Sequence, residues 1–539
     1  MLAWRETRKE EMPQVSDNRL PCQQEHSHLL CPLQRNPLQV VMKGSGQSDY
    51  SAMAPHIYIA GKTKANAMSL FVIELKKIDQ SKDNYLFLPI NYLFLQAIGI
   101  FKEINGMVID FTISNFRSIK DPQTISFEAT DDTHLEQYYV IQKGKYRLLK
   151  IAALLGANAS GKSNVLKAFM LFPTLMLNPC ENKDSIIKYK RFALDDICEK
   201  SDSTMIINFI CGQQKYNYEV HFNNASITYE LLKVELFESG TRVRKVFERR
   251  TDPTTMYASV VLGDSYKSYA AKFKDLSLNL LHNRTVFGAF QKSNVEIPWL
   301  KEINDWVKSY WLPAVKTTDQ HLSEYTTARI HEGEIQKNDV VSILKKADIG
   351  VNDLSISEKI ETLPKSVIDY ILNNGNAPEG LKKQVKEDPT TKDLVVKLAH
   401  NGKNGTVPFD FSEESRGTQR YYELSSVLLM IVKEPHFLAI DELECQMHPD
   451  LYEHFITSYL NNSKESQLIY TTHMREFLSD RDLFRDDSVW FTEKNEEGVS
   501  EIYSLADFGT EILRQGNSRY NAYRSGRLGA IPRLGDTQL

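Results

Sequence analysis

Residues 156–163 constrain this chain more than any other stretch. They read G-A-N-A-S-G-K-S, the G-x-x-x-x-G-K-S pattern of a phosphate-binding loop. The apolar run 151–155 comes directly before them, as a buried strand would. After them, Val165, Leu166 and Phe169 are spaced for one buried face of a helix. The order of strand, loop and helix predicts a binding site for a nucleoside triphosphate.

Each residue type in this loop suits a phosphate ligand. Backbone N–H groups of the loop and of the helix N-terminus can hold the phosphates. We expect Lys162 to reach the outer phosphates and the Ser163 hydroxyl to bind Mg²⁺, with ATP as the nucleotide. A chance Gly-rich turn is the competing interpretation, and the matching strand and helix argue against it. The candidate nucleotide-binding residues of the loop are Gly156, Ala157, Asn158, Ala159, Ser160, Gly161, Lys162 and Ser163.

Composition narrows the class of protein. The net charge of −5 argues against attraction of nucleic acid over the whole surface, although a local basic groove stays open. The six cysteines form no C-x-x-C pair, so neither a zinc hook nor a disulfide framework is expected. Scattered thiols and a polar, charged N-terminus without a secretory signal predict a cytoplasmic protein. The apolar stretch 85–101 contains Pro89, Asn91 and Gln96 and is slightly short for a membrane span, so we expect no membrane helix.

The character of the sequence changes along its 539 residues, which exceed one ordinary domain. Residues 1–106 form an extension of doubtful structure, and Met107 is the expected natural start of the core; a real accessory domain is the alternative. The α/β core is split into an N-terminal half, 107–200, and a C-terminal half, 401–539, where strands and helices alternate. Between them we expect a β-rich subdomain, 201–270, and a mainly helical insertion, 271–400. No heptad pattern is sustained, so a long coiled-coil arm is not expected.

A second nucleotide-binding element follows the strand Phe437–Ile440. This apolar strand ends in two carboxylates, Asp441 and Glu442. Asp441 is a candidate ligand of Mg²⁺, together with Ser163. Glu442 is the candidate general base that polarises the attacking water during hydrolysis. A strand that simply ends in an acidic turn would look the same, but the loop at 156–163 favours the functional interpretation.

Two further segments are candidates for contact with the γ-phosphate. Ser415 and Gly417 open a predicted helix about twenty residues before the Asp-Glu strand, and a helix N-terminus can bind an anion. S-x-G alone is weak and could be only a helix cap. His473 follows the predicted strand 467–470 and two threonines, where it could contact the γ-phosphate and respond to its loss; we count it as catalytic with Glu442.

The order of these motifs resembles the ABC-type ATPase head of SMC and RecF-like proteins. A closer resemblance is to bacterial AAA family ATPases of the overcoming-lysogenisation-like group. The segments that carry it are NFRSIKD, GANASGKSNVLKAF, ESRGTQR, FLAIDELECQMHP, IYTTH and RLGAIP. It spans about residues 107–532. The implied fold is a P-loop NTPase with an ABC-like ATPase head.

The resemblance also implies partners. In such heads two subunits clasp the same ATP, so Ser415 and Gly417 would act on the nucleotide of the other subunit in a homodimer or higher homo-oligomer. His448 would begin the next helix and not bind metal, and the role of Glu444 stays open. Two features depart from the family pattern. Arg416 replaces a smaller or acidic residue, and no convincing glutamine loop lies between Ser163 and Ser415; Gln291 is a poor candidate.

Two functions fit these features. The first is an ATPase that regulates bacterial defence against phage or foreign DNA through a separately encoded effector, a nuclease or toxin. The segment after His473 is too short for a TOPRIM nuclease domain, so the effector is expected on another chain. The second is a RecF-like ATPase that binds DNA, for which the basic residues near 188–191 and 242–250 are candidates. A transporter subunit is disfavoured because no transport spans are visible.

Overall fold

The computed structural model describes strands within residues 58–62 and 68–72, and then residues 106–536 apart from 237–241, 318–320, 375–378, 510–517 and 533–534. The chain divides into two units, Met1–Asp83 and Asn84–Leu539. In the first unit, strands β1 (Tyr58–Lys62) and β2 (Met68–Val72) pair antiparallel. The apolar stretch 85–101 lies outside the described residues, and the expected boundary at residue 106 stays a prediction.

A five-stranded sheet forms the centre of the second unit, with strand order β16-β17-β7-β18-β19. Strands β16, β17, β7 and β18 are parallel, and β19 is antiparallel at one edge. Every residue of β7, β16 and β17 is buried, as in parallel sheets covered on both faces. The strands are β7 (Ile151–Leu155), β16 (Phe437–Ile440), β17 (Gln467–Thr471), β18 (Val489–Lys494) and β19 (Ser500–Ser504). The expected strands at 151–155 and 437–440 and the expected α/β fold are confirmed.

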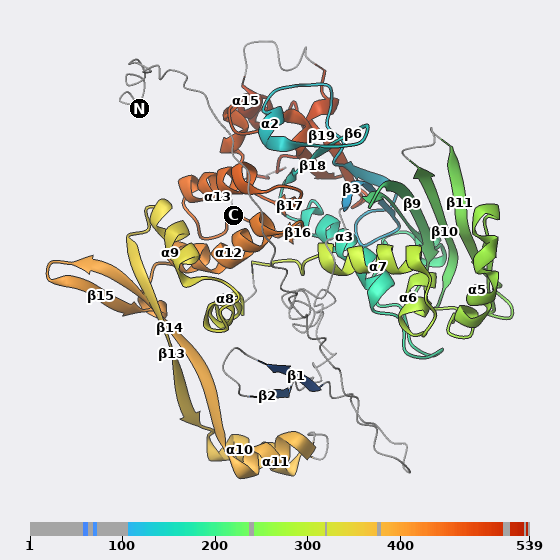
Figure 1. The fold of residues 1–539 in the computed structure, drawn as a ribbon. Coiled ribbons are helices and arrows are strands. Elements are labelled where there is room, and N and C mark those ends of the chain that lie inside the picture. Colours follow the sequence, from blue (N-terminus) through green and yellow to red (C-terminus); the bar gives the residue numbers. More distant parts are fainter. Residues whose placement is uncertain are drawn as a thin grey trace, which may run out of the picture. The chain divides into compact units, whose positions relative to one another are not determined.

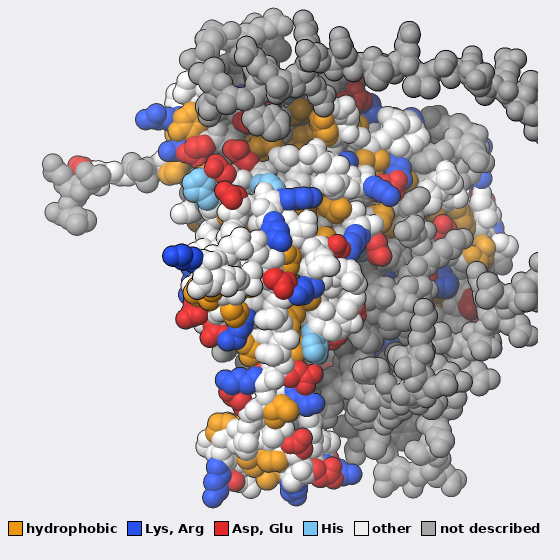
Figure 2. Space-filling model, turned by 60° about the vertical axis from the view of Figure 1, so that its left-hand side comes forward, with side chains coloured by type: hydrophobic (Ala, Val, Ile, Leu, Met, Phe, Trp, Pro, Cys, Tyr) orange, Lys and Arg blue, Asp and Glu red, His pale blue; other side chains and the backbone are white. Residues whose placement is uncertain are grey.

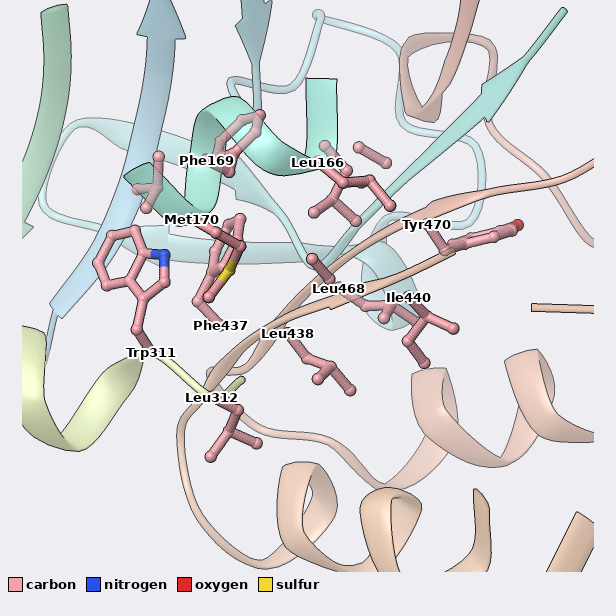
Figure 3. Packing of buried hydrophobic residues seen from close by; sticks show 14 of the residues in the cluster. Leu166, Phe169, Met170, Trp311, Leu312, Phe437, Leu438, Ile440, Leu468 and Tyr470 are labelled. Atoms are coloured by element: carbon pink, nitrogen blue, oxygen red, sulfur yellow. The ribbon is translucent and has the colours of Figure 1, made fainter. Parts of the chain in front are cut away.

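Helix α3 (Lys162–Leu177) joins this sheet to a second one. Phe169 stacks on Phe437 of β16, with ring centroids 5.3 Å apart, and Phe172 of the same helix lies 6.2 Å from Phe209 of the second sheet. In Figure 3, Phe169 and Met170 of α3 lie in one group of buried side chains with Phe437 and Trp311. The helix that follows the phosphate loop is therefore fixed by aromatic contacts to both sheets.

The second sheet has seven antiparallel strands in the order β12-β11-β10-β9-β8-β3-β4. Its members are β3 (Gly106–Ser114), β4 (Gln123–Ser126), β8 (Ser203–Cys211), β9 (Gln214–Phe222), β10 (Ile227–Leu236), β11 (Val243–Thr251) and β12 (Ala258–Leu262). The β-rich subdomain expected at 201–270 thus forms one sheet with the first strands of the core. Buried Gln467 of β17 accepts a hydrogen bond from Val108 N and donates one to Val108 O. This side chain ties the parallel sheet to a register shift in β3, between Val108 and Asp110.

Shorter elements lie between and after the strands of the two sheets. They are β5 (Val140–Lys143), β6 (Tyr146–Leu149), α2 (Glu136–Tyr139), α4 (Asp196–Lys200), η1 (Asp264–Tyr269), η3 (Glu476–Ser479), η4 (Asp486–Ser488), η5 (Leu505–Asp507) and α15 (Arg519–Arg524). Within the described ranges, no helix has the length and apolar character needed to cross a membrane.

The middle of the chain is helical up to Lys346 and then forms a long β-hairpin. Its helices are α5 (Ala270–Ser277), α6 (Val286–Gln291), α7 (Pro298–Tyr310), α8 (Leu322–His331) and α9 (Lys337–Lys346). Strands β13 (Val351–Thr362) and β14 (Thr390–Gly402) then form a long antiparallel hairpin, with α10 (Lys365–Asn373) and α11 (Glu379–Glu387) between them, and β15 (Gly405–Asp410) pairs with β14 (Figure 1). We call the segment from β13 through β15 the arm.

The arm departs from the expected mainly helical insertion. Its strands pair residues far apart in sequence, such as Thr362 with Thr390 and Val351 with His400. Local patterns do not report such pairing. In β13 only Leu354 and Ile356 alternate with polar residues before a mostly exposed stretch, which is too short a signal to mark the whole strand. Figure 2, which brings this side of the molecule forward, shows Lys and Arg interspersed with Asp, Glu and hydrophobic side chains.

Candidate functional site

The phosphate-binding loop has a backbone that its glycines make possible. Gly161 has φ 116° and Gly156 has φ 157°. A Cβ on Gly156 would lie 2.3 Å from the carbonyl oxygen of Thr492, and one on Gly161 would lie 2.3 Å from Ser500 Oγ. Both positions therefore exclude larger residues, for conformation and for space. Ala159 also has a positive φ, 61°.

Hydroxyl groups of Thr492 in β18, Ser500 in β19 and Ser118 in a turn form hydrogen bonds that hold the loop in place. Ser500 Oγ donates its proton to the carbonyl oxygen of Ser160 at 2.6 Å and lies 2.8 Å from Ser118 Oγ, from which it can accept. The hydroxyls of Ser160 and Thr492 are 2.6 Å apart. We did not anticipate these residues from sequence, because serine and threonine in strands carry no distinctive pattern; Ser118 belongs to the NFRSIKD segment, to which no role was assigned.

Lys162 is buried at the start of α3. Its Nζ donates to the carbonyl oxygens of Gly156 at 2.8 Å and Ala157 at 3.0 Å. Burial lowers the pKa of this ammonium, and the nearby Asp441 and Glu442 oppose the shift. The cation thus lies against the loop, where a phosphate would compete with the two carbonyls for its protons.

Asp441 and Thr471 lie at the ends of the neighbouring strands β16 and β17, where Ser163 of α3 meets them. Asp441 Oδ1 accepts hydrogen bonds from Ser163 Oγ at 3.0 Å and from Thr471 Oγ1 at 2.7 Å. Both predicted Mg²⁺ ligands are therefore in contact, although they are far apart in sequence. Hydroxyl and carboxylate oxygens are the donors that Mg²⁺ takes, usually with waters and substrate phosphates, so these residues fit the ion.

Glu442 and His473 face each other beside that pair. Glu442 Oε1 lies 3.8 Å from His473 Nε2, and the backbone N–H of His473 donates to Glu444 Oε1 at 2.6 Å. Glu442 has a positive φ, 51°, which is rare for a non-glycine residue. Partial burial and the charge of Lys162 lower the pKa of His473, so its imidazole is held toward the neutral form.

These groups surround one cavity of about 300 Å³. It is lined by Asn158, Ala159, Ser160, Gly161, Lys162, Ser163, Asn164, Asp441, Glu442, His473 and Lys494. A second cavity of about 330 Å³ lies along the start of the loop, where Gly156, Ala157 and Asn158 meet Arg475 and Tyr523. Asn158 and His473 line both cavities. In the described parts of the chain, no cluster of three or more His, Cys, Asp or Glu side chains is arranged to hold a metal.

Ser415 and Gly417 lie at a different place, the N-terminus of α12 (Arg416–Lys433). Ser415 Oγ accepts from the backbone N–H of Thr418 at 3.1 Å, so it caps this helix. A Cβ on Gly417 would be 3.3 Å from the carbonyl oxygen of Gln446. His448 likewise caps α13 (Pro449–Asn462), because its Nδ1 accepts from Asp450 N.

The arm contacts the same helix terminus. His400 Nε2 of β14 lies 2.7 Å from Glu414 Oε1, directly before Ser415, after the short helix η2 (Phe411–Glu413) that leads out of β15. Further along α12, the hydroxyl of Ser426 lies 2.7 Å from that of Thr326 in α8. Helix α12 is thus joined to both the arm and the helices that precede it.

The comparisons with known proteins agree with this geometry. Residues 317–479 match the family model "AAA domain, putative AbiEii toxin, Type IV TA system", a segment that includes Ser415, Asp441, Glu442 and His473. No curated protein matches the chain. The match of residues 317–479 to an AAA domain agrees with the resemblance to AAA family ATPases seen in the sequence.

Solved SMC heads are similar at low identity. One is an Smc head bound to the C-winged helix domain of ScpA, at 14% identity and TM-score 0.33, covering 74% of this chain and 97% of that one. The SMC head domain from Thermotoga maritima has 13% identity and TM-score 0.28, covering 74% and 98%. A third, an Smc head with extended coiled coil bound to the C-terminal domain of ScpA from Pyrococcus furiosus, has 13% identity and TM-score 0.31, covering 76% and 99%.

Proposed function

We propose that this chain binds and hydrolyses ATP with Mg²⁺ and acts as a switch that closes around the nucleotide as a homodimer. The observation that carries the proposal is the convergence of Lys162, Ser163, Asp441, Glu442 and His473 on one cavity. A cation, a hydroxyl–carboxylate pair and a second carboxylate within reach of water are the groups that phosphoryl transfer to water requires.

The residues divide the work between binding and proton transfer. Lys162 and the loop N–H groups bind the phosphates, while Ser163 and Asp441 would hold Mg²⁺, which neutralises phosphate charge when bound. Glu442 is 42% exposed at its side chain, so water can reach it and give up a proton. His473, held toward the neutral form, can donate one hydrogen bond to a γ-phosphate or to Glu442.

The proposed dimer follows from the position of Ser415 and Gly417. They lie at a helix terminus next to Gln446 and are absent from the residues that line the cavity. A second subunit could supply this N-terminus to the γ-phosphate, since helix N-termini favour anions. ATP would then promote association and ADP would not, because a ligand shifts an equilibrium only by its differential affinity for the two states.

Light scattering with ATP and with ADP tests the dimer on the Glu442→Gln background. We expect a doubled mass with ATP only, and its loss in Ser415→Arg, which should still bind nucleotide as a monomer. Ser277→Arg, at the exposed C-terminal end of α5, is the matched control for adding a surface cation in place of serine. Equal masses in both nucleotides would contradict the switch.

For the biological role, we propose the ATPase component of an anti-phage defence system that controls a separately encoded nuclease or toxin. The matched family description, which names a toxin of a type IV toxin–antitoxin system, supports a role of this kind. Phage plating efficiency on cells carrying the gene with its neighbouring reading frames, compared with Lys162→Ala, tests it. Equal plating in both would contradict the defence role.

The RecF-like alternative needs a basic surface, and one of its candidate clusters is weakened. Arg249 is fully buried and donates to the carbonyl oxygens of Ile227 and His282. Lys245 and Arg250 both pair with Glu248. These residues therefore offer less free charge than the sequence suggested, and salt-dependent duplex binding would distinguish the two roles.

A further inference from the structure

Thr471 is the last residue of β17, and its side chain lies between the two acidic residues of the site. Its hydroxyl accepts a hydrogen bond from the backbone N–H of Glu442 at 2.7 Å and donates one to Asp441 Oδ1 at 2.7 Å. The residue is fully buried. One hydroxyl group thus contacts the candidate Mg²⁺ ligand and the backbone of the candidate base.

These two hydrogen bonds fix the orientation of the Thr471 hydroxyl group. An N–H group can only donate and an ionised carboxylate can only accept, so the single hydroxyl proton must point to Asp441. A chain from N–H to hydroxyl to carboxylate is also mutually polarising. The rotamer of Asp441 and the backbone of Glu442 are therefore fixed relative to each other by one side chain.

Glu442 needs such a support because of its conformation. Its φ of 51° is in the left-handed region, which a non-glycine residue keeps only where neighbouring groups hold it. The main chain of Thr471 adds a second anchor, since its carbonyl oxygen accepts from the backbone N–H of Leu443 at 3.1 Å. Parallel pairing of Thr471 with Leu154 fixes the anchor itself to β7, the strand that enters the phosphate loop.

We propose that Thr471 is a positioning residue that sets both Mg²⁺ binding and the placement of the base, while contributing little to the binding of nucleotide alone. The inference rests on the proposed function. It distinguishes Thr471 from Lys162, which acts on the phosphates directly, and from Ser163, which is itself a candidate ligand. Asp441 would keep one hydroxyl partner, Ser163, when Thr471 is changed.

Thr471→Val and Thr471→Ser test the proposal in the full-length protein. Valine replaces the hydroxyl by a methyl group at nearly constant volume, which leaves the N–H of Glu442 unpaired; serine restores the hydroxyl. The first measurement is equilibrium binding of a fluorescent ATP analogue titrated with Mg²⁺. We expect the Mg²⁺ concentration at half-saturation to rise ~10-fold in Thr471→Val, with binding in EDTA unchanged and serine within ~3-fold of the parent.

The second measurement is the split between kcat and KM. Loss of a group that orients a ligand or base costs about 10- to 100-fold, and we expect this loss in kcat of Thr471→Val while KM for ATP changes little. Thr326→Val is the control for deleting a buried threonine hydroxyl, because Thr326 is equally buried but contacts Glu423 and Ser426. It should keep the parental Mg²⁺ dependence.

The outcomes separate this inference from the proposed function. A parent protein that neither binds nor hydrolyses ATP would overturn both. A parent that does so, with Thr471→Val showing the parental Mg²⁺ dependence and kcat, would overturn the role of Thr471 alone. The same holds if Thr471→Ser loses as much as Thr471→Val, because the hydroxyl would then not be the group that matters.

Discussion

The parallel sheet and the arm differ in what holds their residues in place. Every side chain of β7, β16 and β17 is buried, and the functional groups follow directly at the ends of these strands. In the arm, all six residues of β15 are exposed and α10 has no buried residue. The candidate site, whose groups interact at distances near 3 Å, is thus carried by the rigid, buried strands. The exposed arm is suited instead to contact with another molecule.

The largest expected effect lies at the end of the sheet. Glu442→Gln should lower kcat by about 10²–10⁴ and leave ATP affinity near that of the parent, because the amide keeps the shape but cannot accept a proton. Steady-state hydrolysis and nucleotide-binding titrations check this. Glu358→Gln, the same change in β13 of the arm, should retain the parental rate. Hydrolysis by Glu442→Gln at the parental rate would show that another group is the base.

Substitutions of buried residues at the parallel sheet should lower the free energy of unfolding much more than substitutions in the arm. Trp311 is buried and stacks on Phe437, with centroids 5.0 Å apart, so Trp311→Ala should lower the free energy of unfolding by about 3–5 kcal/mol. Tyr370 of α10 is 69% exposed, and Tyr370→Ala should change it by less than about 0.5 kcal/mol. Urea denaturation of both variants measures the difference. Similar losses would mean that the arm is covered by a partner subunit in solution.

A pH-dependent effect of intermediate size is expected from His436, just before β16. Burial lowers its pKa to about 4, from the ordinary value of 6.5, and its Nδ1 lies 2.9 Å from the carbonyl oxygen of Ser309. The unfolded chain therefore takes up this proton at a higher pH than the folded one. Its contribution is present above about pH 6.5 and is lost as the pH falls toward 4, by up to about 3 kcal/mol.

Urea denaturation between pH 7.5 and pH 4.5 isolates this contribution of His436. His436→Gln should show a shallower decline in the free energy of unfolding than the parent over that range. His321, whose side chain is 73% exposed, offers the matched control, and His321→Gln should follow the parental curve. Parallel curves for all three proteins would rule out His436 as the source.

The smallest effect is expected from shortening the arm. Glu358 of β13 pairs with Leu394 of β14, so residues 359–393 can be replaced by an Asn-Gly turn, which favours a tight hairpin. Nucleotide affinity should stay within about 2-fold and the melting temperature within about 2 °C, since the removed side chains are mostly exposed. Differential scanning fluorimetry with and without ATP measures both. A large loss of affinity would show that the arm tip supports the nucleotide site.

The sequence predicts the structure correctly where one short motif specifies a strand and the loop that follows it. The patterns at residues 151–163 and 437–442 predicted the strands β7 and β16. The structure brings the side chains that follow these two strands together. The sequence did not anticipate Thr471, Ser500 or Thr492, because a hydroxyl in a strand gains its role only from a partner hundreds of residues away or on the adjacent strand. The arm was missed for a related reason: strands β13 and β14 pair residues that are 28 to 49 positions apart, from Thr362 with Thr390 to Val351 with His400, and the apolar alternation within each strand is short.

The outer edge of β16 has a further consequence. Trp311 and Val315 form bridges to Phe437 and Ile440, and the backbone N–H of Asp441 donates to Val315 O at 2.8 Å. An open edge in a sheet this apolar would be a template for edge-to-edge addition of foreign strands. Because the chain's own segment occupies it, two copies cannot fuse their sheets there into a continuous ribbon. If two copies associate as proposed, they must therefore meet through surfaces other than this edge.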